Sequence, residues 1–75
     1  MIELLCATVD DHCGCRVEEM LFDGVDLHVH YEDGNADAYL DIDPDNFEPH
    51  LTSQPAPTMR EGRVAVLRWA RSILQ

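Results

Sequence analysis

The sequence predicts an α+β fold, a four-stranded antiparallel β-meander (ββββα) with one C-terminal amphipathic helix packed on one face. Three observations support this prediction. Apolar and polar residues alternate along short segments, two Asp-Gly pairs separate three of these segments, and residues 58–74 have a helical apolar periodicity. With 75 residues the chain is expected to form one domain. Within it we expect the sheet over residues 2–43, a proline-containing loop over 44–57 and the helix over 58–74.

The Asp-Gly pairs fix the register of three strands. The predicted strands are 2–9, 16–22, 25–31 and 36–43. Asp-Gly is typical of two-residue hairpin turns. With Asp33-Gly34 as one turn, every apolar residue of the third strand faces an apolar residue of the fourth, ending with Val25 opposite Ile42. A slip of one residue would destroy this match. With Asp23-Gly24 as the other turn, the second strand extends the same buried face.

The loop and the helix follow from proline and from a capping signal. All four prolines fall between residues 44 and 57, and proline both removes a ladder donor and restricts the residue before it. Thr58 and Glu61 fit the S/T-x-x-E capping box. The apolar helix face contains Met59, Val66, Leu67, Trp69, Ala70, Ile73 and Leu74, with Trp69 expected at its centre. The opposite face gathers Arg60, Arg63, Arg68 and Arg71.

The charge is strongly negative and unevenly divided. Fifteen acids, five arginines and no lysine give a net charge of −10. Residues 1–58 account for −13 and residues 59–75 for +3. This balance argues against direct binding to nucleic acid, because phosphates would be repelled. No segment has the apolar length of a membrane span or the pattern of a signal peptide, so a cytoplasmic protein is expected.

The outer face of the third and fourth strands is the first candidate surface. The register places Asp26 opposite Asp41, His28 opposite Tyr39 and His30 opposite Asp37, with Glu19 of the second strand beside His28. Like charges placed opposite each other cost stability. A solvated face with screened charges is the simplest interpretation, and a histidine proton, a metal or a basic partner are the alternatives.

The three cysteines, Cys6, Cys13 and Cys15, give an odd count without a secretory signal. This pattern favours free thiols in a reducing compartment over a disulfide framework. Cys6 lies in an apolar run and is expected to be buried, whereas Cys13 and Cys15 flank Gly14 in a polar turn. An intermolecular disulfide through an exposed thiol is the alternative interpretation.

A small zinc-binding or redox-responsive domain is one alternative function. Its ligands would be Cys13, Cys15, His28 and His30, because thiolates and imidazoles are the ligands that zinc prefers. The C-x-C spacing is uncommon for structural zinc. The run 41–45 has the D-x-D-x-D start of a calcium-binding EF-hand loop but lacks its later glycine and glutamate, so a solvated acidic loop is expected.

In size, acidity and expected architecture, the whole chain resembles the small phage anti-CRISPR inhibitor proteins, which share no sequence motif. The resemblance implies a non-enzymatic inhibitor that blocks the basic nucleic-acid-binding surface of a CRISPR complex by charge mimicry, without a cofactor. Carboxylates spaced along strands can stand in for phosphates. The residues expected to bind the partner are Asp26, Asp37, Asp41, Asp43, Asp45 and Glu48.

A dimeric structural or interaction subunit is the third interpretation. Chains of this size often need help to hold a core. The expected apolar seam consists of Leu4, Cys6, Val17 and Leu21 on the outer face of the first two strands. No catalytic motif is present, so an enzyme is not expected.

Overall fold

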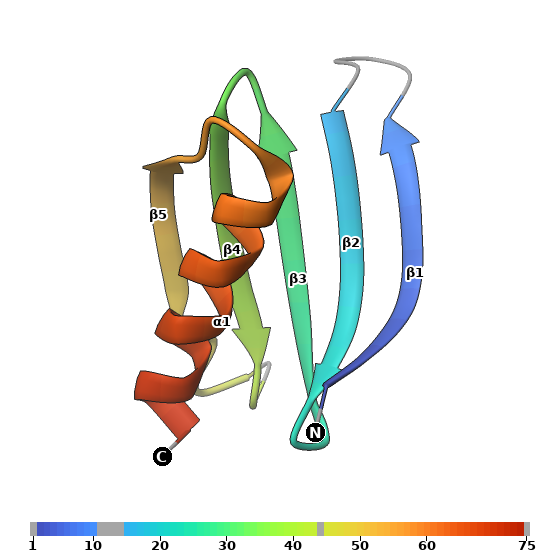
Figure 1. The fold of residues 1–75 in the computed structure, drawn as a ribbon. Helices are drawn as coiled ribbons and strands as arrows, with labels where there is room; N and C mark the ends of the chain where they lie inside the picture. The colour runs from blue at the N-terminus through green and yellow to red at the C-terminus, as the bar shows by residue number, and fades with distance from the viewer. Residues whose placement is uncertain (1, 11–14, 44, 75) are drawn as a thin grey trace.

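One antiparallel sheet carries a single helix on one of its faces (Figure 1). The structure, a computed structural model, describes residues 2–10, 15–43 and 45–74, without the side chains of residues 6 and 8–10. The sheet has the order β1-β2-β3-β4-β5. Its elements are β1 (Ile2–Asp10), β2 (Cys15–Phe22), β3 (Val25–Glu32), β4 (Asn35–Asp41), β5 (His50–Pro55) and α1 (Met59–Leu74). The predicted α+β class is confirmed, but the sheet has five strands rather than four.

The two predicted hairpins are confirmed. Asp23 and Gly24 have φ values of 50° and 81°, and Asp33 and Gly34 have values of 49° and 75°. Positive φ at both central residues is the mark of the type I′ turn. The register that follows is also the expected one, with Leu27 opposite both Met20 and Leu40. The fourth strand ends earlier than predicted, at Asp41, and Ile42 is exposed beyond it.

β5 corrects the prediction that residues 44–57 form a loop. It pairs with β4 at the edge of the sheet, with His50 opposite Tyr39 and Leu51 opposite Ala38. An edge strand needs hydrogen bonds on one side only, so it tolerates proline. Pro49 precedes the strand and Pro55 is its last residue. These two prolines therefore lie at the ends of the strand and do not prevent it from forming.

A register shift in β1 divides the predicted dimer seam. Leu4 pairs with Met20, whereas Cys6 pairs with Glu19, so the irregularity falls between Leu4 and Cys6. Directly paired residues point to the same side of a sheet. Leu4 therefore lies on the helix side with Met20, where it is exposed, and does not continue the outer-face row that contains Val17 and Leu21. The side chain of Cys6 lies outside the described residues.

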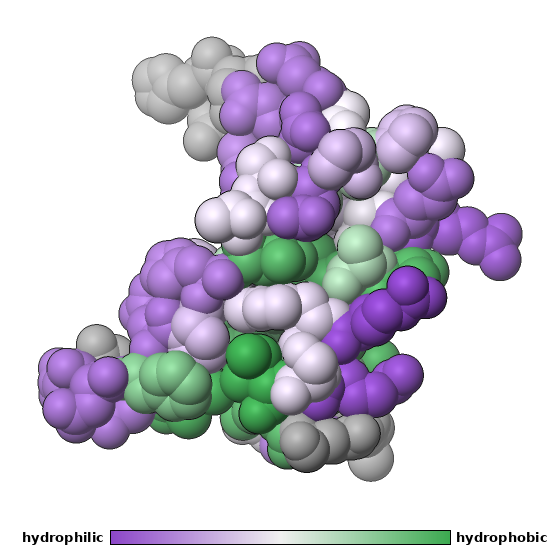
Figure 2. Space-filling view, turned by 90° about the vertical axis from the view of Figure 1, so that its left-hand side faces the viewer, coloured by the Kyte–Doolittle hydropathy of each residue, from purple (hydrophilic) through white to green (hydrophobic). Residues whose placement is uncertain are grey.

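The core lies between α1 and strands β2, β3 and β4, and Leu51 of β5 packs against it (Figure 1). Its fully inaccessible members are Leu27, Leu40, Val66 and Ala70. The prediction that Trp69 lies at the centre of the apolar helix face is wrong. Trp69 is partly buried at the margin of that face. The buried helix positions are Gly62, Val66 and Ala70, which recur every four residues and so form one line along the helix. Figure 2 shows hydrophobic residues in the middle of the molecule, flanked by hydrophilic ones.

The start of α1 follows the predicted capping signal. The backbone N–H of Glu61 donates a hydrogen bond to Thr58 Oγ1 over 3.2 Å. This bond satisfies one of the backbone donors that a helix start leaves without an intrahelical partner. Among the described residues, no helix has the length and apolar character needed to cross a membrane.

Candidate functional site

The sheet face opposite α1 is not covered by the helix, and we call it the open face. Its polar and aromatic residues include Glu19, Asp26, His28, His30, Glu32, Asp37, Tyr39, Asp41 and His50. The predicted pairs are confirmed, with Asp26 opposite Asp41, His28 opposite Tyr39 and His30 opposite Asp37. Four strands therefore bring carboxylates and aromatic rings onto one surface, and a regular ladder holds their spacing.

A row of three stacked rings crosses the open face. The centroids of His28 and Tyr39 lie 4.5 Å apart with an interplanar angle of 10°. The centroids of Tyr39 and His50 lie 5.5 Å apart at 28°. The row runs from β3 through β4 to β5, so it depends on the fifth strand. Because each ring stacks on its neighbour, the facing surfaces are already covered, and within the row only the outer faces of the two end rings, His28 and His50, are left for another planar group.

Carboxylates surround the central ring of this row. Burial raises the pKa of the Tyr39 phenol, and the negative charges of Glu48, Asp41 and Glu19 raise it further. These three acids come from the loop before β5, from β4 and from β2. Their combined effect on one phenol indicates a negative potential at the middle of the open face.

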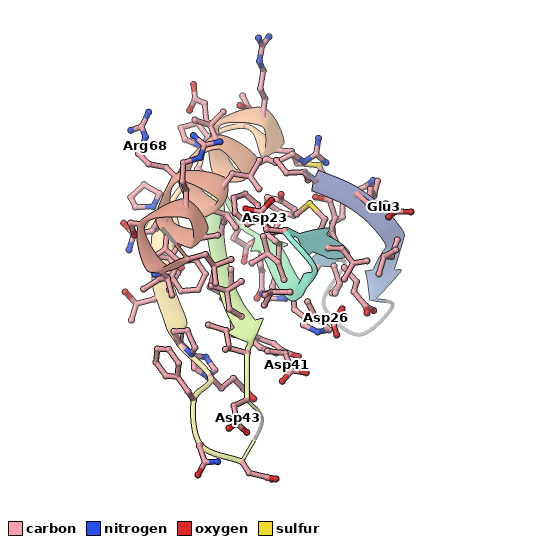
Figure 3. The ribbon with its side chains drawn as sticks, turned by 90° about the horizontal axis from the view of Figure 1, so that it is seen from below. Glu3, Asp23, Asp26, Asp41, Asp43 and Arg68 are labelled. Carbon is pink, nitrogen blue, oxygen red and sulfur yellow. The ribbon has the colours of Figure 1, made fainter. Side chains whose placement is uncertain are left out.

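The Asp26–Asp41 pair places two like charges directly opposite each other on this surface. Figure 3 shows both side chains on the side of the sheet away from α1, whereas Arg68 lies on the far side of the helix. Asp41 Oδ1 is buried and has no hydrogen-bond partner among the described residues. Two like charges opposite each other, one of them lacking a donor, would gain from a positively charged neighbour.

The other predicted acids have different roles. Asp37 Oδ2 lies 3.5 Å from His30 Nδ1, and Glu48 Oε1 lies 3.3 Å from His50 Nε2. Asp43 and Asp45 do not lie on the open face. They belong to the turn after β4, where Asp43 accepts hydrogen bonds from the backbone N–H of Asp45 and from Asn46 Nδ2, over 3.2 and 2.9 Å.

These hydrogen bonds define the turn around Asp43. The hydrogen bond from Asn46 is the main reason that the pKa of Asp43 lies below its usual range. An aspartate that accepts bonds from its own following residues is an Asx turn. Asp43 of the D-x-D-x-D run therefore has a local role in the turn, whereas Asp41 lies on the open face opposite Asp26.

Cys15 lies close to two potential metal ligands, and it is oxidised. One ligand atom each from Cys15, His30 and Glu32 lie within 4.8 Å of one another. This grouping includes Cys15 and His30, as predicted, but replaces His28 with Glu32, because His30 and Glu32 are the β3 residues nearest to the start of β2. Cys15 is disulfide-bonded, which corrects the expectation of a free thiol there. Cys13 lies outside the described residues.

Glu18 is a buried acid that sequence reasoning did not single out. Its side chain is inaccessible to solvent on the helix side of β2. It accepts hydrogen bonds from Tyr31 Oη and from Arg63 Nη2, and Arg16 Nε lies 3.5 Å from it. Arg63 thus leaves the basic outer face to which its sequence position assigned it. The alternation with Met20 and Phe22, two and four residues later, is the signal that places Glu18 inward.

The fold therefore contains acidic residues in two contrasting electrostatic environments. Glu18 is fully paired and serves the structure, whereas the acids of the open face lack cationic partners of comparable quality among the described residues. Comparisons with protein-family models, with curated proteins and with solved structures found no match.

Proposed function

We propose that the chain is a small acidic, non-enzymatic binding protein that docks its open face on the basic, nucleic-acid-binding surface of a partner. One observation carries the proposal: Asp26 and Asp41 face each other on a helix-free surface, and Asp41 Oδ1 has no hydrogen-bond donor among the described residues. A cationic partner placed against this pair would relieve the repulsion between the two carboxylates.

Charge and shape both support this function. The net charge of −10 steers association with basic surfaces and speeds it. At the ends of the stacked row, His28 and His50 each have an outer ring face onto which an arginine guanidinium group can stack beside the carboxylates of the open face. Arginine is the residue that proteins use most often for bidentate contact with phosphate, and a carboxylate offers it the same fork-shaped contact.

Within this function, we propose that the chain is a phage inhibitor and that its partner is a CRISPR complex. Such a complex presents a basic channel to its target nucleic acid. A rigid acidic face of this size could occupy part of that channel. The test uses a panel of purified CRISPR surveillance complexes and labelled target DNA, with DNA binding measured by electrophoretic shift as the protein is added.

Matched charge variants separate the open face from overall acidity. The triple variant Asp26→Asn, Asp37→Asn, Asp41→Asn removes three charges from the open face. The control, Asp23→Asn, Asp33→Asn, Glu61→Gln, removes three charges from the two hairpin turns and the helix start, where asparagine suits the turn geometry.

The expected result is at least a tenfold loss of inhibition for the first variant and a change of less than threefold for the control. If both variants lost inhibition equally, the effect would depend on net charge alone, and a specific role of the open face would be contradicted. Undiminished DNA binding by every complex of the panel would contradict the CRISPR assignment. Binding of both triple variants to a labelled protamine peptide then tests whether the open face binds a basic partner at all.

A further inference from the structure

We propose that reduction of the Cys15 disulfide creates a zinc site from Cys15, His30 and Glu32, so that metal binding by this chain is controlled by redox state. The inference does not depend on the proposed docking function. It rests on three ligand types brought together by the pairing of β2 and β3.

The geometry suits a tetrahedral ion. Sulfur, nitrogen and oxygen atoms of the three residues already lie within 4.8 Å of one another. Ligands at about 2.0–2.3 Å from a zinc ion are at most about 4 Å apart, so small side-chain rotations complete the set. Cys15 is buried, whereas the side chains of His30 and Glu32 are partly exposed, at 34% and 44%. An ion would therefore bind at the surface, directly above the cysteine.

His30 is oriented as a ligand. Its Nε2 lies 3.9 Å from Glu32 Oε2, and its Nδ1 lies 3.5 Å from Asp37 Oδ2. Histidines that bind zinc generally present their second ring nitrogen to a carboxylate, which fixes the tautomer and strengthens the ligand. Asp37 is thus a positioning residue, and it acts on the nitrogen opposite to the one that faces Glu32.

The surface beside this group is hollowed. A cavity of about 180 Å³ lies next to β3 and β4. Its lining residues are His30, Glu32, Asp33, Asn35, Asp37 and Ser53. A small hydrated ion can enter there, and a water molecule can occupy the fourth coordination position that three protein ligands leave open.

The disulfide decides whether the site can exist. In the oxidised chain the Cys15 sulfur is bonded to another sulfur and offers no thiolate. A dithiol reductant breaks the S–S bond, which takes up two electrons and two protons, while the dithiol becomes its own disulfide. Zinc then binds the Cys15 sulfur and releases its proton. Zinc binding to the thiolate in turn opposes reoxidation.

Zinc titration of the two redox forms tests the inference. The protein is reduced with dithiothreitol, desalted without oxygen and titrated with Zn²⁺ by calorimetry beside the oxidised protein. We expect one zinc per chain in the reduced form and at least a hundredfold weaker binding in the oxidised form. His30→Gln and Glu32→Gln should each weaken binding tenfold or more, and Asp37→Asn about tenfold. His28→Gln, a neighbouring histidine on the same face, should change it less than twofold.

Cobalt provides a readout that does not depend on any variant folding. Co²⁺ added to the reduced wild-type protein should produce a thiolate-to-cobalt charge-transfer band, and Zn²⁺ should remove it. The inference is overturned if the reduced protein binds no metal, if the oxidised protein binds it equally well, or if the His28 and His30 variants lose the same affinity.

Discussion

Tyr31 Oη donates a hydrogen bond to Glu18 Oε1 over 2.9 Å, inside the face of the sheet that α1 covers. Arg63 of α1 contacts the other oxygen of the same carboxylate. One buried acid therefore joins β2, β3 and the helix. A buried carboxylate is costly unless it is fully paired, so this contact both requires and enforces the docking of α1 at one position.

Removing the cation should cost more than removing the acid. Arg63→Met leaves the buried Glu18 carboxylate with Tyr31 and with Arg16 Nε at 3.5 Å, and we expect the unfolding free energy to fall by about 3 kcal/mol. Glu18→Gln keeps an oxygen that can accept the hydrogen bond of Tyr31. It leaves Arg63 without its carboxylate, but the Arg63 side chain is 42% exposed and can reach water. We therefore expect the unfolding free energy to fall by only about 1 kcal/mol. Urea denaturation measures both. Equal losses, or a larger loss for Glu18→Gln, would contradict this order.

The stability that Glu18 contributes should disappear in acid. Burial raises the pKa of Glu18, but the hydrogen bonds and charges of its partners outweigh burial and hold it below its ordinary value of 4.5. A pKa lowered by folding gives stability that is present above pH 4.5 and is lost as the pH falls through the folded-state value. The difference in unfolding free energy between wild type and Glu18→Gln should therefore be constant near neutrality and narrow below pH 4.5. If this difference in unfolding free energy widened in acid instead, the predicted pKa direction of Glu18 would be wrong.

The two tyrosines should ionise late. Burial, together with the hydrogen bond and charge of Glu18, raises the pKa of Tyr31 to about 12. Burial and nearby acids also raise the pKa of Tyr39 above its ordinary value. Ultraviolet absorbance of tyrosinate should therefore stay low in the folded protein at pH 10.0, the ordinary phenol pKa. Tyr31→Phe should remove the later of the two steps. Half-ionisation of both phenols at that pH would contradict the buried pairing.

Gly62 is required for the close approach of α1 to the sheet. A Cβ there would lie 3.0 Å from Ala56 Cβ, 3.0 Å from Tyr31 Cε1 and 3.2 Å from Ala36 Cβ. Gly62→Ala gains about 1 kcal/mol of helix propensity, but overpacking costs about 1–3 kcal/mol, so we expect a net loss of about 1 kcal/mol. A thermal melt should show a midpoint lowered by about 4–8 °C.

Val64→Ala is the control for this substitution. Val64 lies on the same helix but is half exposed, so its truncation tests helix propensity with little packing. Its melting midpoint should change by less than about 2 °C. A Gly62→Ala variant more stable than wild type would show that α1 can move away from Ala56 and Tyr31 at little cost.

The sequence by itself determined the hairpins and the polarity of their faces. Two Asp-Gly turns and strict alternation leave one register, and that register alone placed Asp26 opposite Asp41 and His28 opposite Tyr39. Turn geometry and side-chain period are local properties, so they can be read without knowing the rest of the fold. Thr58 marked the helix start for the same reason.

Only the tertiary structure decided which polar groups meet. β5 needs the open edge of β4, and without it His50 could not extend the ring row of the open face. Glu18 acquires its partner from a helix 45 residues away in the sequence. The grouping of Cys15 with His30 and Glu32 likewise depends on where β2 begins beside β3. Edge pairing, long-range ion pairs and ligand clusters join distant segments, and no local pattern in the chain specifies their distances.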